Sequence, residues 1–129
     1  MAGRPTRVVN EGGLTMADVM AETSGVKELV VEINGKTGTI VYRDLSFWAR
    51  NLALSSATEY YADETGSLRT KFHIEVYYEE CLKHMIVQAP FPISAMVLRG
   101  MSREAGDQLV QIVPHPQDWT VKAETTKKG

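Results

Sequence analysis

The tripeptide Gly35-Lys36-Thr37 comes closest in composition to a phosphate-binding loop. That loop requires another glycine five positions before Gly35, where this chain has Val30, and a helix directly after the threonine. Residues that favour strands stand on both sides of the tripeptide instead. The pattern therefore predicts an ordinary turn between two strands, with no bound nucleotide.

Three side chains that can ligate metals lie near His84. Glu80 is four positions and Cys81 three positions before it, and His73 is eleven positions before it. A metal site needs three or four ligands, whereas helical spacing turns Cys81 towards the expected core and Glu80 and His84 away from it. We expect a solvated helix face here, with a His73 and His84 pair as the alternative. The sequence predicts no metal site and no cofactor.

Candidates for catalysis are few. No Gly-x-Ser-x-Gly segment is present to expose a nucleophilic serine. The neighbouring carboxylates of Asp63 and Glu64 fall in an expected loop, and no pattern places a second acidic group opposite them. We therefore predict no catalytic residue and expect that the protein is not an enzyme.

Composition narrows the class of protein further. The 129 residues correspond to one domain that can bury roughly two-thirds of its unfolded surface, and the single cysteine allows no internal disulfide. A formal net charge of -2 provides no large positive field for a nucleic acid. No apolar run approaches the roughly 20 residues that span a bilayer. A cytoplasmic protein without a nucleic-acid or membrane partner is expected.

Periodicity and capping residues predict an α+β fold that is mostly helical, with an N-terminal β-hairpin packed against a small bundle of three to five helices. Residues 13–114 form the single globular domain, between a flexible segment at 1–12 and a flexible tail at 115–129. Two β-branched runs around Asn34 and Gly35 predict the hairpin. The expected elements are a short helix at 16–22, the hairpin at 28–43 and helices at about 46–60, 72–88, 94–100 and 102–113.

The expected helix at 72–88 has two apolar lines. The wider one is assigned to the core and consists of Ile74, Tyr78, Cys81, Leu82 and Met85. A thinner line consists of Phe72, Val76 and Val87. Either another element covers this thinner line, or it binds a partner protein.

Two aromatic residues extend the candidate partner-binding set. Phe91 stands between two prolines just after the long helix, where a core position and an exposed position are equally reasonable. Trp48 opens the helix expected at 46–60, and a core position is favoured over an exposed anchor. The candidate partner-binding residues are therefore Phe72, Val76, Val87, Phe91 and Trp48.

The order of these elements resembles that of the tail assembly chaperones of long-tailed phages and related viruses. The similarity covers roughly residues 28–113, without the N-terminal segment or the tail. It rests on the hairpin, an acidic glycine-containing loop and four stretches: Tyr42-Arg43-Asp44-Leu45-Ser46-Phe47-Trp48, Ala49-Arg50-Asn51-Leu52, Met85-Ile86-Val87-Gln88-Ala89-Pro90-Phe91 and Ser102-Arg103-Glu104-Ala105-Gly106-Asp107-Gln108-Leu109.

This resemblance implies a small helical protein that binds the tape measure protein, keeps that long helical chain soluble and helps tail tube subunits gather around it. It implies residence in the host cytoplasm during infection and absence from the mature virion. Self-association of the chain is a further expected contact. The alternative is a structural tail or connector protein that stays in the virion.

Overall fold

The computed structural model describes residues 12–20 and 25–116. The predictions of a flexible segment at 1–12 and a flexible tail at 115–129 fall almost entirely outside these residues. Near the N-terminus, Thr15 and Asp18 form a reciprocal capping box around α1 (Met16–Val19). This helix ends at Val19, earlier than the expected residue 22, because Met20 is already extended.

The predicted hairpin is confirmed. Strands β1 (Lys27–Ile33) and β2 (Lys36–Tyr42) pair antiparallel, and Asn34 and Gly35 form the two-residue turn with φ angles of 57° and 76°. Its placement differs from the prediction, because β5 (Ile86–Gln88) pairs with β2 and makes a three-stranded sheet in the order β1-β2-β5. The hairpin is thus the main part of a sheet and does not pack alone on a helical bundle.

The helix expected at 46–60 is too long. Helix α2 (Phe47–Ser56) is capped by Ser46, whose hydroxyl accepts a hydrogen bond from the Ala49 amide at 3.1 Å. The following residues form β3 (Thr58–Ala62), which pairs antiparallel with β4 (Leu68–Phe72). Threonine and tyrosine favour strands, and this second hairpin satisfies their peptide groups in place of another helical turn.

Asp63 closes the loop of the second hairpin. Its carboxylate accepts hydrogen bonds from the Thr65 and Ser67 amides at 2.9 and 3.0 Å and from Arg69 Nε at 2.8 Å. Hydrogen bonds from the Thr65 hydroxyl, first of all, and from Arg69 lower the Asp63 pKa to about 2. The loop is therefore organised around the ionised form of this side chain.

Acid should loosen this loop. Because the folded-state pKa of Asp63 lies below its ordinary value of 3.8, its stabilising contribution is complete above pH 3.8 and is lost as the pH falls towards about 2. An NMR titration of the carboxyl group should show a midpoint near the lower value. In Asp63→Asn the loop amides should exchange faster at neutral pH. A midpoint at 3.8 would contradict the described hydrogen bonding.

The remaining helices follow the cap residues. The Ser94 and Ser102 hydroxyls accept hydrogen bonds from Val97 and Ala105 amides and begin α4 (Ala95–Arg99) and α5 (Arg103–Leu109), as predicted. A 3-10 turn, η2 (Val110–Ile112), extends α5. The helix expected at 72–88 is shorter at both ends: α3 runs over Ile74–Met85.

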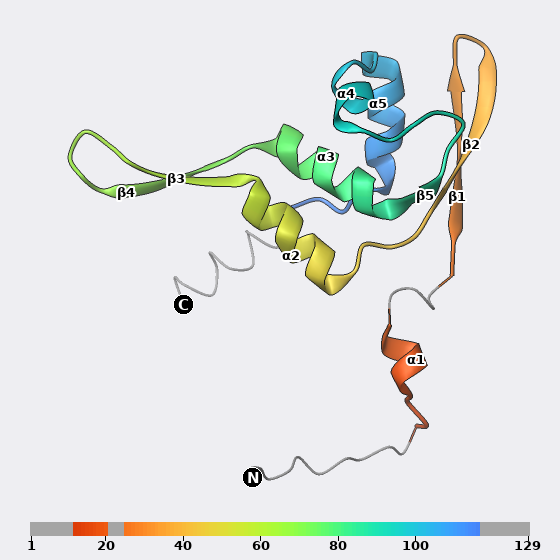
Figure 1. The fold of residues 1–129 in the computed structure, drawn as a ribbon, viewed down its shortest axis with the longest axis horizontal. Coiled ribbons are helices and arrows are strands. Elements are labelled where there is room, and N and C mark those ends of the chain that lie inside the picture. Colours follow the sequence, from red (N-terminus) through yellow and green to blue (C-terminus); the bar gives the residue numbers. More distant parts are fainter. Residues whose placement is uncertain (1–11, 21–24, 117–129) are drawn as a thin grey trace.

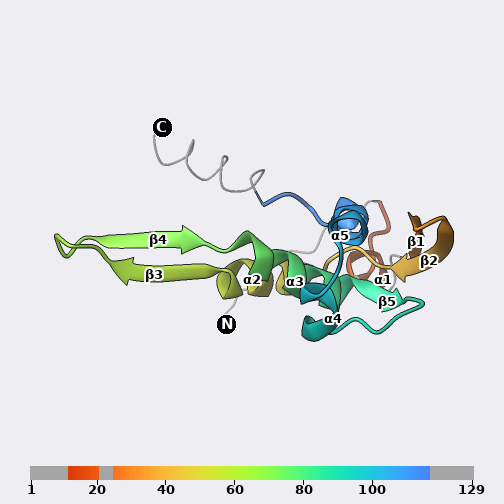
Figure 2. The ribbon, with the colours of Figure 1, turned by 90° about the horizontal axis from the view of Figure 1, so that it is seen from above.

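The elements form a body with a projecting arm. Figure 1 shows α2 and α3 side by side in the centre, α4 and α5 on one side of α3, and the three-stranded sheet at one end of the body. The β3–β4 hairpin extends away from the opposite end in both views (Figures 1 and 2). Helices contain 41% of the described residues and strands 27%, so the fold is α+β but not mostly helical. No helix among the described residues has the length and apolar character needed to cross a membrane.

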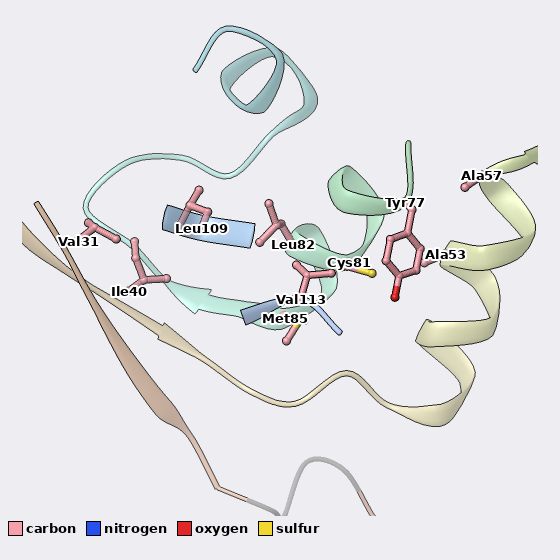
Figure 3. Close-up of a cluster of buried hydrophobic side chains, with 10 residues drawn as sticks. All are labelled: Val31, Ile40, Ala53, Ala57, Tyr77, Cys81, Leu82, Met85, Leu109 and Val113. Carbon is pink, nitrogen blue, oxygen red and sulfur yellow. The ribbon is translucent and has the colours of Figure 1, made fainter. Parts of the chain in front are cut away.

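The core lies between the sheet, α2, α3 and α5 (Figure 3). Ile40 and Leu109 are fully buried at its sheet end, and Ala53 of α2 and Ala57 just after this helix are fully buried beside α3. On α3 the buried side chains recur every four residues, at Tyr77, Cys81 and Met85, with Leu82 beside them. The prediction of Cys81, Leu82 and Met85 is confirmed.

One predicted core position on α3 is wrong, because Ile74 is 41% exposed. Tyr78 is partly buried and packs against the core, whereas Tyr77, which was not predicted, is fully buried. The difference is a rotation of the helix, because the small residues of α2 leave space that Tyr77 fills. Its hydroxyl donates a hydrogen bond to the carbonyl oxygen of Pro114 at 2.8 Å. This bond attaches the segment after η2 to the core.

Candidate protein-binding site

An open groove lies between α3 and the pair α4 and α5. It has a volume of about 740 Å³, and residues of α3, α4 and α5 line it. Its apolar lining comes from seven residues: Val76, Tyr78, Leu82, Leu98, Met101, Leu109 and Val110. Most of these are only partly buried, so the groove presents apolar surface to solvent. A surface of this shape and composition is suited to an amphipathic helix.

Each bordering helix supplies one stripe to the groove at helical spacing. On α3 the lining positions are Glu75, Val76, Tyr78, Glu79 and Leu82, and on α5 and η2 they are Arg103, Gly106, Asp107, Leu109 and Val110. Gly106 lies in the middle of the second stripe. A Cβ atom built there meets no atom within 4 Å, so the missing side chain helps to keep the groove open.

Charged side chains of both signs form the rim. Arg99 of α4 donates to the Glu79 carboxylate of α3 through Nε at 2.9 Å and through a terminal nitrogen at 3.3 Å. This hydrogen-bonded carboxylate raises the pKa of Arg99. Arg103 and Asp107 lie 4.0 Å apart on the other side and are mostly exposed. The rim thus holds α4 against α3 and leaves charges available to a partner.

The five predicted partner-binding residues do not form one surface. Val76 lines the groove, but Phe72 belongs to β4 and Val87 to β5. The predicted line through these three assumed a helix over 72–88, and it fails because Phe72 and Val87 lie outside α3. Phe91 is partly buried and packs against the core.

Trp48 is also placed differently from the favoured expectation. It lies on α2 with 71% of its surface exposed, next to Phe47 at 73%. The small residues of the same helix fill the contact with α3, so the large aromatic side chains face outwards. Trp48 therefore remains a candidate anchor, but it is not part of the groove.

Comparison of this chain with protein-family models, with curated proteins and with solved structures finds no match. Its functional assignment therefore depends on the sequence pattern and on the geometry of the groove.

Sequence reasoning missed most of the groove. Leu98, Met101 and Val110 come from three neighbouring segments whose approach to α3 is a tertiary feature. One available signal was the spacing of Arg103, Gly106 and Val110, which places a glycine at the centre of one helical face. That pattern indicates a face without a large side chain, although it does not identify the helix opposite.

His73 and His84 each lie beside a different glutamate. His73 Nε2 lies 2.7 Å from Glu59 Oε1 of β3, whereas His84 Nε2 lies 3.8 Å from Glu80 Oε1 on α3. The two histidines therefore do not form the pair that was considered as the alternative. Among residues 12–20 and 25–116, no group of three or more His, Cys, Asp and Glu side chains is arranged for a metal ion.

Cys81 should be protected from thiol reagents. Its side chain is fully buried, and burial raises the pKa of its thiol to about 11. At neutral pH the native protein should therefore react with a disulfide reagent only as fast as it unfolds, and in denaturant the thiol should react at once. A rapid native reaction would show that α2 and α3 separate more readily than their packing indicates.

Proposed function

We propose that this protein is a viral tail assembly chaperone that binds the tape measure protein, keeps it soluble and promotes assembly of the tail tube around it. The observation that carries the proposal is the open apolar groove between α3 and α5. The resemblance of the sequence stretches within residues 28–113 also supports it.

The groove favours a helical partner. An amphipathic helix presents apolar side chains three and four residues apart, and the two stripes that line the groove have the same spacing. The mixed charges of Glu79, Arg99, Arg103 and Asp107 lie where the polar flanks of such a helix would run. A long helical chain with apolar stretches, such as a tape measure protein, has many segments of this kind.

The proposed mode of action is contact without catalysis or a cofactor. Binding covers the apolar stripe of the tape measure protein and leaves the charged rim and the outer helix faces in water, which keeps the complex soluble. Tail tube subunits then gather around the covered chain and displace the chaperone. The protein accordingly acts in the host cytoplasm during infection and is absent from the mature virion.

Co-expression tests this function. Producing the tape measure protein from the same viral genome with and without this chain should give a clear rise in its soluble yield, and the two proteins should purify together. An unrelated acidic protein of similar size serves as the control. Unchanged yield together with no co-purification would refute the proposal.

A structural tail or connector subunit is the second candidate. The exposed β3–β4 arm favours it, because projecting hairpins with unpaired edges suit contacts between neighbouring subunits. Mass spectrometry of purified virus particles separates the two functions. Copies in stoichiometric amounts would assign the chain to the virion, and their absence fits the chaperone.

A further inference from the structure

The β3–β4 arm has one uncharged face and one charged face. The antiparallel register pairs Thr58 with Phe72, Tyr60 with Thr70 and Ala62 with Leu68 on the same face, because side chains alternate along a strand. Tyr60 is 67% and Leu68 74% exposed on this face. The opposite face carries Glu59, Tyr61, Arg69 and Lys71.

Both outer edges of the arm present peptide groups to solvent. The amide of Asp63 donates to the Ser67 carbonyl, and the amide of His73 donates to the Ala57 carbonyl. Hydrogen-bonded pairs alternate with non-bonded pairs in an antiparallel ladder. The peptide groups that point away from the ladder therefore belong to six residues: Thr58, Tyr60 and Ala62 on β3, and Leu68, Thr70 and Phe72 on β4.

In the three-stranded sheet, a side chain forms hydrogen bonds with the outer edge of β1. The Gln108 side chain accepts a hydrogen bond from the Glu32 amide at 2.9 Å and donates one to the Glu32 carbonyl at 2.8 Å. At this one residue of β1 the glutamine takes the place of a neighbouring strand. No such side chain covers the described edges of β3 and β4. A two-stranded ribbon is marginally stable by itself, so pairing with a third strand would stabilise the arm.

The two edges carry opposite charge. β3 and the loop after it contain Glu59, Asp63 and Glu64 without a basic residue, whereas β4 contains Arg69 and Lys71 without an acidic one. Opposite charges directly across neighbouring strands stabilise their pairing, and like charges destabilise it. The added strand that best suits β4 is therefore acidic, and β3 itself meets that requirement.

We propose that copies of this chain associate head to tail, with β4 of one copy pairing antiparallel with β3 of the next in the register that the arm already uses. Thr70 then exchanges backbone hydrogen bonds with Tyr60 of the next copy, and Lys71 stands opposite its Glu59. A two-fold pairing of β4 with β4 centred on Thr70 would instead place Arg69 opposite Lys71 twice.

This contact leaves one unpaired β3 and one unpaired β4 at the two ends of the assembly, so copies can be added until a ring closes. It also places the uncharged faces of successive arms side by side as one continuous surface. The inference does not rest on the proposed function, because the groove contains no residue of the arm.

Proline substitutions at the two edges test the head-to-tail contact. Thr70→Pro and Tyr60→Pro each remove an outward amide while the inward hydrogen bonds of the arm remain. In sedimentation velocity, the wild-type chain and the controls Thr70→Ala and Tyr60→Ala should form species larger than dimers as concentration rises. Each proline variant alone should be monomeric, and an equimolar mixture of the two should give a heterodimer and nothing larger.

Other outcomes overturn the proposal. A proline variant that dimerises alone would indicate a two-fold contact, and a monomeric wild type or a mixture without heterodimers would exclude the pairing. Amide exchange in the wild-type chain gives a test without substitutions. The amides of Tyr60 and Thr70 should become protected as concentration rises, and exchange that does not change with concentration would equally refute the contact.

Discussion

Replacing Tyr77 with alanine should lower the free energy of unfolding by about 4 kcal/mol, as expected for removal of a buried aromatic ring. Tyr77 is the largest of the fully buried side chains. Its ring lies 5.7 Å from the ring of Phe72 and 6.1 Å from that of Tyr78, and it fills the space beside Ala53 (Figure 3). Because small domains are stable by only about 5–15 kcal/mol, this substitution should remove a large fraction of the total stability.

Tyr77→Phe is the matched control for this substitution. It keeps the ring and removes the hydroxyl, which donates a hydrogen bond to the Pro114 carbonyl and also interacts with the Cys81 thiol; this loss should cost about 1–2 kcal/mol. Urea unfolding followed by circular dichroism measures both variants. Equal losses for the two substitutions would mean that the ring contributes little packing, and this result would contradict the described core.

Replacing Gly106 with tryptophan should abolish binding of the tape measure protein and leave the fold intact. The position lies at the centre of the α5 stripe, and a side chain built there enters open space and not the core. A large ring should therefore occupy the groove that the partner helix requires. Co-purification from cells that produce both proteins measures the loss, and circular dichroism confirms that the variant is folded.

Gly106→Ala is the matched control at the same position. A methyl group leaves most of the groove open, so binding should be retained. The alanine should also raise the free energy of unfolding by about 0.5–1 kcal/mol, because glycine inside a helix has a larger conformational entropy in the unfolded chain. If the tryptophan variant bound as well as the alanine variant, the partner would have to contact another surface.

Local signals in the sequence predicted the first hairpin and three helix starts. Asn34 and Gly35 adopt positive φ without large strain, and Ser46, Ser94 and Ser102 cap helices from within their own segments. These features depend on residues within a few positions of each other. For that reason they could be placed without knowledge of the tertiary structure.

The missed elements depend on contacts between distant segments. Residues 58–62 could extend α2, and they form β3 only because β4 provides a pairing strand. Ile86, Val87 and Gln88 could likewise extend α3, and they form β5 because the free edge of β2 accepts them. The predicted partner line through Phe72 and Val87 failed for the same reason.

The candidate site depends both on local sequence signals and on contacts between distant segments. Val76 was predicted on a thinner apolar line apart from the main core; it lines the groove and also packs against the core. The opposite wall depends on how α4 and α5 return to α3, which the ion pair of Arg99 with Glu79 and the contact of Gln108 with Glu32 stabilise. Neither contact leaves a spacing pattern that identifies its partner.

Hydrogen exchange of this chain alone and in complex with the co-expressed tape measure protein tests the central claim most directly. Binding in the groove predicts slower amide exchange in α3 and from α4 through η2, with little change in β1 and β2. Protection confined to α2 around Trp48, or no complex to measure, would contradict the claim that this groove receives a helix of the tape measure protein.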